Sequence, residues 1–239
     1  MHSPYGMEIV ENCVECRLRT SAFFCNLPAE LLKEFESLKY ATIFPRGAML
    51  FVEGQAPRGV FMLCSGRVKL TTCSGEGKAL ITQIAESGEL LGLSATISGK
   101  PYEVTAETLS PCQVNFIRRE DFLRLLTERG AVCLRAAEYL SQSYHATHEH
   151  VRSLGLSHSA SEKMAKLLLE WGERNGKPSE KGILLKLTLT HEEIAQIIGS
   201  SRETVTRLLG DFKNKQYIYV KGSTLILRNK AALEAMVNS

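Results

Sequence analysis

One stretch constrains this chain more than any other, because residues Leu187–Lys215 read as two short helices separated by a tight turn. Thr190 is a good N-cap for the first helix, and Glu193 three residues later completes a capping box. Gly199 then interrupts the apolar run with a residue that tolerates a positive φ. Ser200 begins the second helix, again with a glutamate three residues on. Two short helices around a glycine turn predict a helix-turn-helix.

Each of the two helices has an apolar face and a polar face. The apolar residues recur at helical spacing: Ile194, Ile197 and Ile198, then Val205, Leu208, Leu209 and Phe212. The polar face of the second helix carries Arg202, Glu203, Thr206 and Arg207. In a DNA major groove, arginine donates two hydrogen bonds to a guanine edge and glutamate accepts one from cytosine. We therefore expect DNA binding here, the alternative being an ordinary helical hairpin with a solvated face.

Length and charge agree with a soluble DNA-binding protein of one or two domains. The 239 residues carry a net charge of +3, and residues 157–239 hold 13 Lys and Arg against 9 Asp and Glu. A mildly basic C-terminal third suits phosphate contacts. No apolar run approaches the roughly 18–20 residues of a membrane helix. The N-terminus also lacks the features of a secretory signal, so we expect a cytoplasmic protein without a membrane partner.

The middle of the chain follows two different patterns. From residue 40 to residue 117, short runs rich in Val, Leu, Ile, Phe and Thr alternate with glycines, which is typical of short strands in a sandwich or barrel. A long helix then runs from about Ala131 to about Leu154. Its stripe is close to a heptad seam and consists of Ala136, Leu140, Ser143, Thr147, Val151 and Leu154. A symmetry mate is the simplest cover for this stripe, which predicts a homodimer, and packing within the same chain is the alternative.

Beyond the helix-turn-helix, two short apolar runs flank the turn at Lys221-Gly222, which predicts a β-hairpin or wing. Lys221 and Arg228 would reach DNA phosphates from it. A final helix, Lys230–Met236, closes the domain.

The chain has seven cysteines: Cys13, Cys16, Cys25, Cys64, Cys73, Cys112 and Cys133. An odd number without a secretory signal argues against a disulfide scaffold. Cys13 and Cys16 are spaced to share one metal centre, with Cys25 nearby and Cys112 as the best distant fourth ligand. The alternative is that the N-terminal cysteines are free thiols in a flexible tail. Cys64 and Cys73 read as core or surface thiols.

These parts, in this order, resemble the Crp/Fnr family of transcription regulators from about Phe24 onward. The resemblance is carried by Pro45-x-Gly47, Glu53-Gly54, Ser65-Gly66-x-Val68, Gly88-Glu-Leu-Leu-Gly92 and Gly199-Ser-Ser-Arg-Glu-Thr-Val-Thr-Arg207. It implies an α+β fold with an N-terminal cyclic-nucleotide-binding-type β-roll, a long dimerisation helix and a C-terminal winged helix-turn-helix. The implied parts are a cysteine-containing segment 1–26, the roll 27–130, the dimerisation helix 131–156 and the DNA-binding domain 157–239.

The resemblance also implies the partners. Arg202, Glu203 and Arg207 fall where the catabolite activator branch reads a TGTGA-type half-site, with Thr206 beside them. Further DNA contacts are expected from Thr190, Ser200, Ser201 and Lys221. The implied partners are palindromic double-stranded DNA with such half-sites, a second copy of the chain and RNA polymerase.

The sensor differs from both main branches of the family. The cyclic-nucleotide branch binds phosphate with an Arg-Ser pair, whereas this chain has Lys100 as the sole cation of that stretch and Glu103 near the position of the arginine. A carboxylate repels phosphate, so we do not expect cyclic AMP as the effector.

The Fnr branch ligates an iron–sulfur cluster with three N-terminal cysteines and one in the roll. Cys13, Cys16, Cys25 and Cys112 resemble that set, although the eight residues between Cys16 and Cys25 are more than usual. A thiol–disulfide pair of Cys112 with an N-terminal cysteine is the other option in the family.

The leading hypothesis is therefore a homodimeric DNA-binding regulator that responds to redox state, oxygen or nitric oxide. The alternative is a regulator of the same build that binds another small ligand in the roll. No nucleophile elbow, P-loop or zinc-protease motif supports an enzyme.

Overall fold

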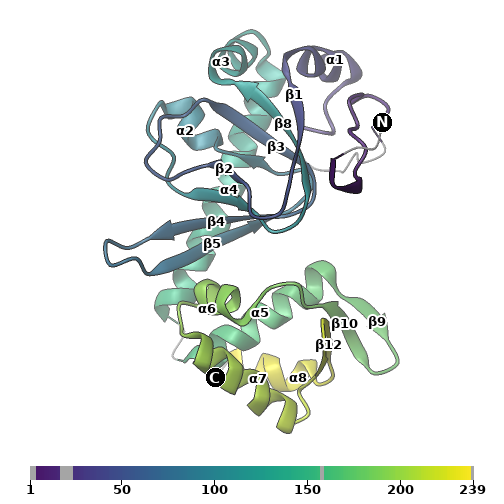
Figure 1. The fold of residues 1–239 in the computed structure, drawn as a ribbon, viewed down its shortest axis with the longest axis vertical. Coiled ribbons are helices and arrows are strands. Elements are labelled where there is room, and N and C mark those ends of the chain that lie inside the picture. Colours follow the sequence, from purple (N-terminus) through teal and green to yellow (C-terminus); the bar gives the residue numbers. More distant parts are fainter. Residues whose placement is uncertain (1–3, 17–23, 157–158, 238–239) are drawn as a thin grey trace. The chain divides into compact units, whose positions relative to one another are not determined.

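The computed structural model describes residues 4–16, 24–156 and 159–237 (Figure 1). The chain divides into two compact units, residues 1–146 and residues 147–239. Within the described part of the chain, no helix is long and apolar enough to cross a membrane. The four-part division expected from the sequence stays a prediction.

The first unit contains two four-stranded antiparallel sheets, which confirms the predicted roll of short strands. One sheet has the order β1-β8-β3-β6, formed by β1 (Tyr40–Phe44), β8 (Cys112–Arg118), β3 (Gly59–Ser65) and β6 (Leu90–Leu91). The other has the order β2-β7-β4-β5, formed by β2 (Met49–Phe51), β7 (Thr105–Thr108), β4 (Val68–Cys73) and β5 (Ala79–Ala85). A single turn of 3-10 helix (Pro4–Gly6) precedes the roll.

Two apolar clusters hold the first unit together. The first contains Phe51, Phe61 and Tyr102, and the rings of Phe51 and Tyr102 stack with their centroids 4.1 Å apart. The second, called here the helix cluster, joins β3 to α1 (Ala29–Leu38), α3 (Arg119–Glu128) and the start of α4 (Gly130–Leu156). Phe24 and Phe122 are fully buried within it. The remaining short helix, α2 (Leu93–Ser98), follows β6.

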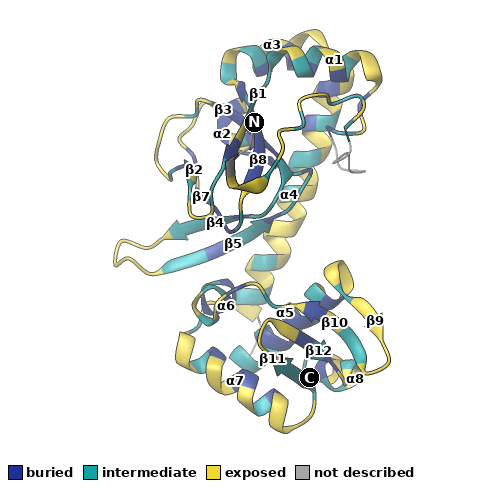
Figure 2. Ribbon diagram, turned by 45° about the vertical axis from the view of Figure 1, so that its right-hand side comes forward, coloured by how far each residue is buried: buried dark blue, intermediate teal, exposed yellow. Residues whose placement is uncertain are grey.

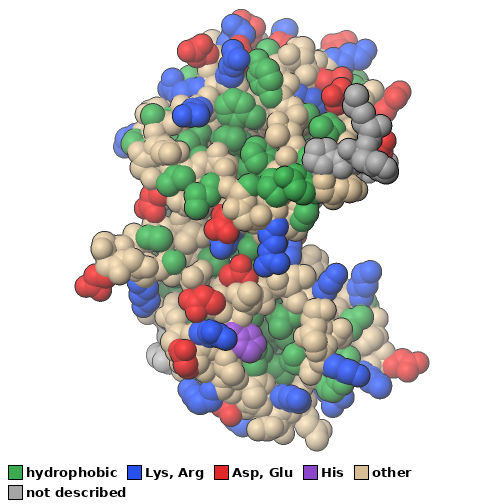
Figure 3. Space-filling model, viewed as in Figure 1, with side chains coloured by type: hydrophobic (Ala, Val, Ile, Leu, Met, Phe, Trp, Pro, Cys, Tyr) green, Lys and Arg blue, Asp and Glu red, His purple; other side chains and the backbone are tan. Residues whose placement is uncertain are grey.

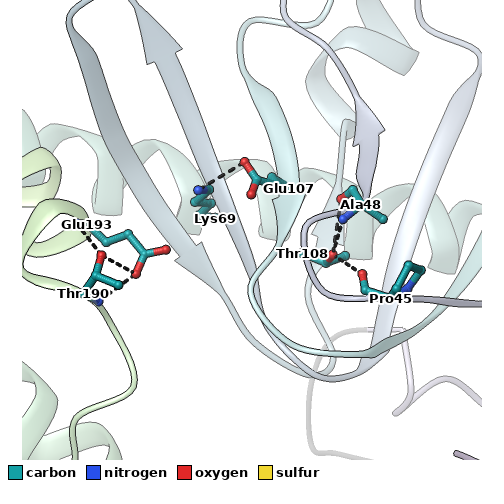
Figure 4. A network of polar contacts seen from close by, with 7 residues as sticks. All are labelled: Pro45, Ala48, Lys69, Glu107, Thr108, Thr190 and Glu193. Atoms are coloured by element: carbon teal, nitrogen blue, oxygen red, sulfur yellow. Dashed lines mark hydrogen bonds and ion pairs between the residues drawn. The ribbon is translucent and has the colours of Figure 1, made fainter. Parts of the chain in front are cut away.

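Two turns explain why the glycine and proline motifs occur where they do. The buried Thr108 hydroxyl donates to the Pro45 carbonyl at 2.5 Å and accepts from the Ala48 N–H at 2.9 Å, which fixes the first turn (Figure 4). Gly66, between β3 and β4, has φ +92°, and a Cβ there would lie 2.5 Å from the Cys112 Sγ. A side chain would therefore be strained by its backbone and would also collide with a buried sulfur.

The second unit is a helical domain with a four-stranded antiparallel sheet of order β11-β12-β10-β9. Its elements are α5 (Ala160–Asn175), β9 (Lys177–Ser179), β10 (Gly182–Lys186), α6 (His191–Ile198), α7 (Arg202–Asn214), β11 (Ile218–Lys221), β12 (Thr224–Leu227) and α8 (Lys230–Val237). The predicted wing is confirmed, with Lys221 opposite Thr224 at its turn. Helix α5 continues past Gly172 to Asn175, and β9 then pairs with β10 in an antiparallel hairpin.

Candidate nucleic-acid interface, dimer helix and cysteine site

Helices α6 and α7 form the predicted helix-turn-helix. Thr190 Oγ1 accepts from the Glu193 N–H at 3.1 Å, and the Thr190 N–H donates to Glu193 Oε2 at 2.8 Å, so the capping box is complete (Figure 4). Gly199 ends α6 in the left-handed conformation at φ +65°. The predicted apolar faces are confirmed, because every residue expected on them is buried. Figure 2 shows the resulting alternation of buried and exposed positions along α7.

The start of α7 differs by one residue from the prediction. Its N-cap is Ser201, whose hydroxyl accepts from the Thr204 N–H at 3.2 Å. Ser200 belongs instead to the end of α6, because its N–H donates to the Ala195 carbonyl at 2.9 Å. The second capping box is therefore absent, and Glu203 is an exposed acid in the first turn of α7. Hydrogen bonds from its own N–H and from Ser201 keep the pKa of the Glu203 carboxyl below its usual value.

Arg202, Glu203 and Arg207 are exposed on one side of α7, as the DNA-binding prediction requires. Arg207 is 67% exposed and lies 3.6 Å from the Asp211 carboxylate. Such a surface ion pair contributes about 0–1 kcal/mol, so Asp211 competes little with a DNA base. Figure 3 shows Lys and Arg side chains spread over the visible face of this unit. The contacts of these residues with DNA stay predictions.

Thr206 has a further partner that the sequence did not indicate. Its hydroxyl donates to the Arg202 carbonyl at 2.9 Å and lies 2.9 Å from the His191 Nδ1. His191 follows the N-cap of α6, so this contact joins the two helices of the motif. In the wing, Lys221 is exposed, whereas the Arg228 guanidinium lies 4.9 Å from the centroid of the Tyr219 ring.

The start of α4 packs on its own roll, and this corrects the predicted dimer seam. Ala136 is 2% exposed in the helix cluster, and Leu140 and Tyr139 pack partly buried against it. The Tyr139 hydroxyl also accepts from the Leu90 N–H at 3.1 Å. A side chain without exposed surface has none left to bury against a partner, so Ala136 follows the same-chain alternative. Leu140 follows it in part, because it packs against the helix cluster and keeps some exposed surface.

The rest of the predicted seam is more accessible. Thr147 and Val151 are exposed, while Ser143 and Leu154 are half-buried. Another stripe of α4, which shares only Val151 with the predicted seam, is exposed and repeats in alternating steps of three and four: Leu134, Ala137, Ser141, Tyr144, His148 and Val151. It includes three large apolar side chains that are 61–68% exposed, Leu134, Tyr144 and Val151. This exposed stripe is the better candidate for a dimer seam.

All seven cysteines lie within the described residues, and none forms a disulfide. Cys13, Cys16 and Cys25 line one small cavity together with Cys64, a residue that the sequence did not select. The predicted fourth ligand, Cys112, is elsewhere: it is fully buried in the cluster of Phe51. Its thiol donates to the Ser110 carbonyl at 3.1 Å and lies 3.4 Å from the Arg67 carbonyl. The predicted set of four cysteines is thus corrected, because β8 directs Cys112 into the core.

Two family models match the chain. One, described as a cyclic nucleotide-binding domain, matches residues 42–129, and the other, described as a Crp-like helix-turn-helix domain, matches residues 162–236. A cyclic-nucleotide-binding-type roll followed by such a domain defines a DNA-binding transcription regulator. The chain belongs to the Crp/Fnr family of transcription regulators.

Individual relatives agree with this assignment. The chain is 27% identical over 224 residues to the nitrogen fixation regulation protein FixK of Bradyrhizobium diazoefficiens, covering 94% of this chain and 93% of that protein. It is 26% identical over 192 residues to a CRP-like cAMP-activated global transcriptional regulator of Mycobacterium tuberculosis, covering 80% and 84%. The solved structure of FixK2 from Bradyrhizobium japonicum has a similar fold, with a TM-score of 0.73, 20% identity and coverage of 83% and 96%. Both curated relatives are named as regulators.

Proposed function

We propose that this chain is a homodimeric, sequence-specific regulator of palindromic DNA with TGTGA-like half-sites. In this proposal its DNA affinity responds to redox state, oxygen or nitric oxide through the N-terminal cysteines. RNA polymerase is the further partner that the family resemblance implies.

The proposal rests mainly on one observation, which is that the N-terminal thiols share a core with α4. Cys13 and Cys25 pack against the helix cluster, and the same cluster buries Val132 and Ala136 of α4. When a local contact changes, a packed core shifts to another discrete arrangement rather than deforming continuously. A chemical change at these sulfurs would therefore act on the base of the candidate dimer helix.

Cyclic AMP is not part of this proposal. Glu103, which stands near the position of the family's phosphate-binding arginine, accepts a hydrogen bond from the Ser94 hydroxyl at 2.8 Å. An exposed carboxylate at that position opposes a phosphate group. The roll interior near Phe51 and Tyr102 is also filled by stacked rings.

The test measures fluorescence anisotropy on a labelled duplex with two TGTGA half-sites centred one helical turn apart, and on a scrambled duplex. In at least one of its two states, reduced or exposed to the oxidant, the protein should bind the TGTGA duplex at least roughly 10³-fold more tightly than the scrambled duplex in the same salt. Exposure to air or a nitric oxide donor should change that affinity by roughly 5- to 150-fold.

Cys73→Ser is the matched control, because Cys73 is exposed at the end of β4 and away from the cavity lining. It should keep the full response to air. If the protein binds the TGTGA duplex and the scrambled duplex with equal affinity in both states, sequence-specific binding is refuted. An affinity that is the same before and after oxidation would refute the sensing role and leave DNA binding intact.

A further inference from the structure

A hydrogen bond joins the two helices of the helix-turn-helix, which lie side by side in the second unit (Figure 1). His191 is half-buried at the first position of α6, and Thr206 is exposed in the middle of α7. The His191 Nδ1 lies 2.9 Å from the Thr206 Oγ1, although the two residues are 15 positions apart in the chain. Thr206 is also on the polar face of α7, between Arg202 and Arg207. The imidazole of α6 is therefore attached to a residue of the face that is expected to read DNA.

The hydrogen atoms of this contact can be assigned from its partners. A threonine hydroxyl has one hydrogen to donate and two lone pairs that accept. The Thr206 hydroxyl donates to the Arg202 carbonyl at 2.9 Å, so toward His191 its oxygen acts as the acceptor. The His191 Nδ1 must then carry a hydrogen, and the ring donates through it. The Thr206 hydroxyl has consequently given its hydrogen and one lone pair to partners within the protein.

These two bonds also restrain the rotamer of Thr206. In a helix, threonine divides between two χ1 rotamers, because its hydroxyl can bond a carbonyl of the preceding turn. The bond to the carbonyl of Arg202, four residues earlier, is of this kind. The contact with His191 restrains the same oxygen a second time and disfavours a rotation that would take it away from α6. The γ-methyl group, which makes no hydrogen bond, is therefore the part of this exposed side chain that remains for a ligand.

The γ-methyl group of Thr206 matches one feature of the DNA major groove. Thymine presents a C5-methyl group there, and the threonine methyl is one of the apolar groups that contact it. A threonine hydroxyl, by contrast, pairs with bases of more than one kind. The neighbours Arg202, Glu203 and Arg207 are charged and suit the polar edges of guanine and cytosine. An apolar contact from Thr206 would add the recognition of thymine, which those charged side chains do not supply.

We propose that His191 is a positioning residue for DNA recognition. By holding the Thr206 hydroxyl within the protein, it leaves the Thr206 methyl group to contact the C5-methyl group of one thymine in each half-site. His191 acts through Thr206 and does not itself read a base. This role rests on the sequence-specific DNA binding proposed above and deepens it, because it assigns the recognition of one base to a pair of residues.

The experiment replaces thymines by deoxyuridines in the palindrome with TGTGA half-sites. Deoxyuridine lacks only the C5-methyl group and keeps the hydrogen-bonding edge, so the substitution isolates the proposed contact. The full chain, in the redox state that binds more tightly, is titrated by fluorescence anisotropy at one salt concentration. Each duplex is altered at one symmetry-related pair of thymines, on either strand.

One pair of thymines should be sensitive to this replacement. At that pair the Kd should rise roughly fourfold for each half-site, and about 15-fold for the two together, because each protomer loses the burial of one methyl group. An unchanged Kd at every pair would overturn the proposal.

Thr206→Ser and Thr206→Val separate the methyl group from the hydroxyl. Each variant is measured on the thymine duplex and on the sensitive deoxyuridine duplex, so a general loss of affinity or of folded protein cancels in the ratio of the two Kd values. Thr206→Val keeps a γ-methyl group and should keep the ratio of the unaltered chain. Thr206→Ser keeps the hydroxyl without the methyl and should bind the two duplexes almost equally. An unchanged ratio in Thr206→Ser would assign the thymine contact to another residue and overturn the proposal.

His191→Ala and His191→Asn test the positioning itself. His191→Ala removes the donor and frees the Thr206 side chain to rotate, so the preference for thymine over deoxyuridine should fall toward that of Thr206→Ser. His191→Asn keeps an N–H group near the place of the ring Nδ1–H and should restore the preference. A merely structural role would lower the affinity of His191→Ala for both duplexes by the same factor. An unchanged ratio of the two Kd values in His191→Ala would therefore overturn the proposal.

The same titrations separate this role of His191 from the DNA binding on which it rests. Equal affinity of the unaltered chain for the TGTGA duplex and the scrambled duplex would refute sequence-specific binding, and the reading of thymine with it. A preference for the TGTGA duplex that no deoxyuridine alters would refute the reading of thymine alone.

Discussion

Leu134→Ala should weaken the homodimer, because Leu134 is 62% exposed and belongs to the exposed stripe of α4. Full burial of a leucine side chain is worth about 1.5–3 kcal/mol. If the exposed 62% is buried by a partner, each copy contributes about 1–2 kcal/mol, and the two copies of a symmetric dimer about 2–4 kcal/mol. At 1.4 kcal/mol per tenfold change, the dimer Kd should rise by up to roughly 30- to 700-fold.

The assay is sedimentation equilibrium over a range of protein concentrations that spans the Kd of the unaltered dimer. Leu184→Ala is the control, since Leu184 is a partly exposed leucine (36%) on β10 and not on α4. It should leave the Kd unchanged. A Leu134→Ala chain that dimerises like the unaltered chain would show that the exposed stripe is not the interface.

The remaining predictions concern DNA binding and stability. Arg202→Ala should cost roughly 1–3 kcal/mol on the preferred half-site and relax base preference at one position, measured by anisotropy on single-base variants, and an equal loss on random DNA would contradict direct readout. Gly66→Ala should lower the free energy of unfolding in urea by at least about 1–3 kcal/mol, because of the φ of +92° and the close Cys112 sulfur, whereas Gly75→Ala, which meets no atom within 4 Å, should be nearly neutral. Burial lowers the pKa of His150, so the unfolded chain binds the proton more tightly. The contribution of His150 to the free energy of unfolding should be fully present above about pH 6.5 and should fall below that pH. His150→Gln should remove that part of the decline, measured by thermal melts at several pH values.

The predictions that were confirmed depend on local chemistry. Thr190, Glu193 and Gly199 act through hydrogen bonds and backbone angles within a few residues, so their roles can be read from adjacent positions. The turn at Lys221 is equally local. Even here the start of α7 shifted by one residue, because two successive serines offer two N-caps and Ser200 is used to end α6.

The corrected predictions depend on packing between distant segments. The spacing of Ala136 and Leu140 showed an apolar face of α4, but periodicity does not say whether the roll or a second chain covers it. Cys64 could not be selected from the sequence, because a bulge against β8 decides where its thiol points. The prediction of Cys112 as the fourth ligand was wrong for a related reason, because the strand β8 places its side chain in the core.

The side chain of Gln113 attaches Val10 to the roll, and this kind of attachment bears on how such chains can evolve. The buried Gln113 amide accepts from the Val10 N–H at 3.0 Å and donates to the Val10 carbonyl at 2.7 Å, so one side chain imitates a neighbouring strand. The backbone of β8 meanwhile keeps its own partners in β1 and β3. Detaching the N-terminal segment would therefore break no ladder bond of the sheet. The architecture therefore allows an N-terminal peptide to be added, exchanged or lost in front of an unaltered roll.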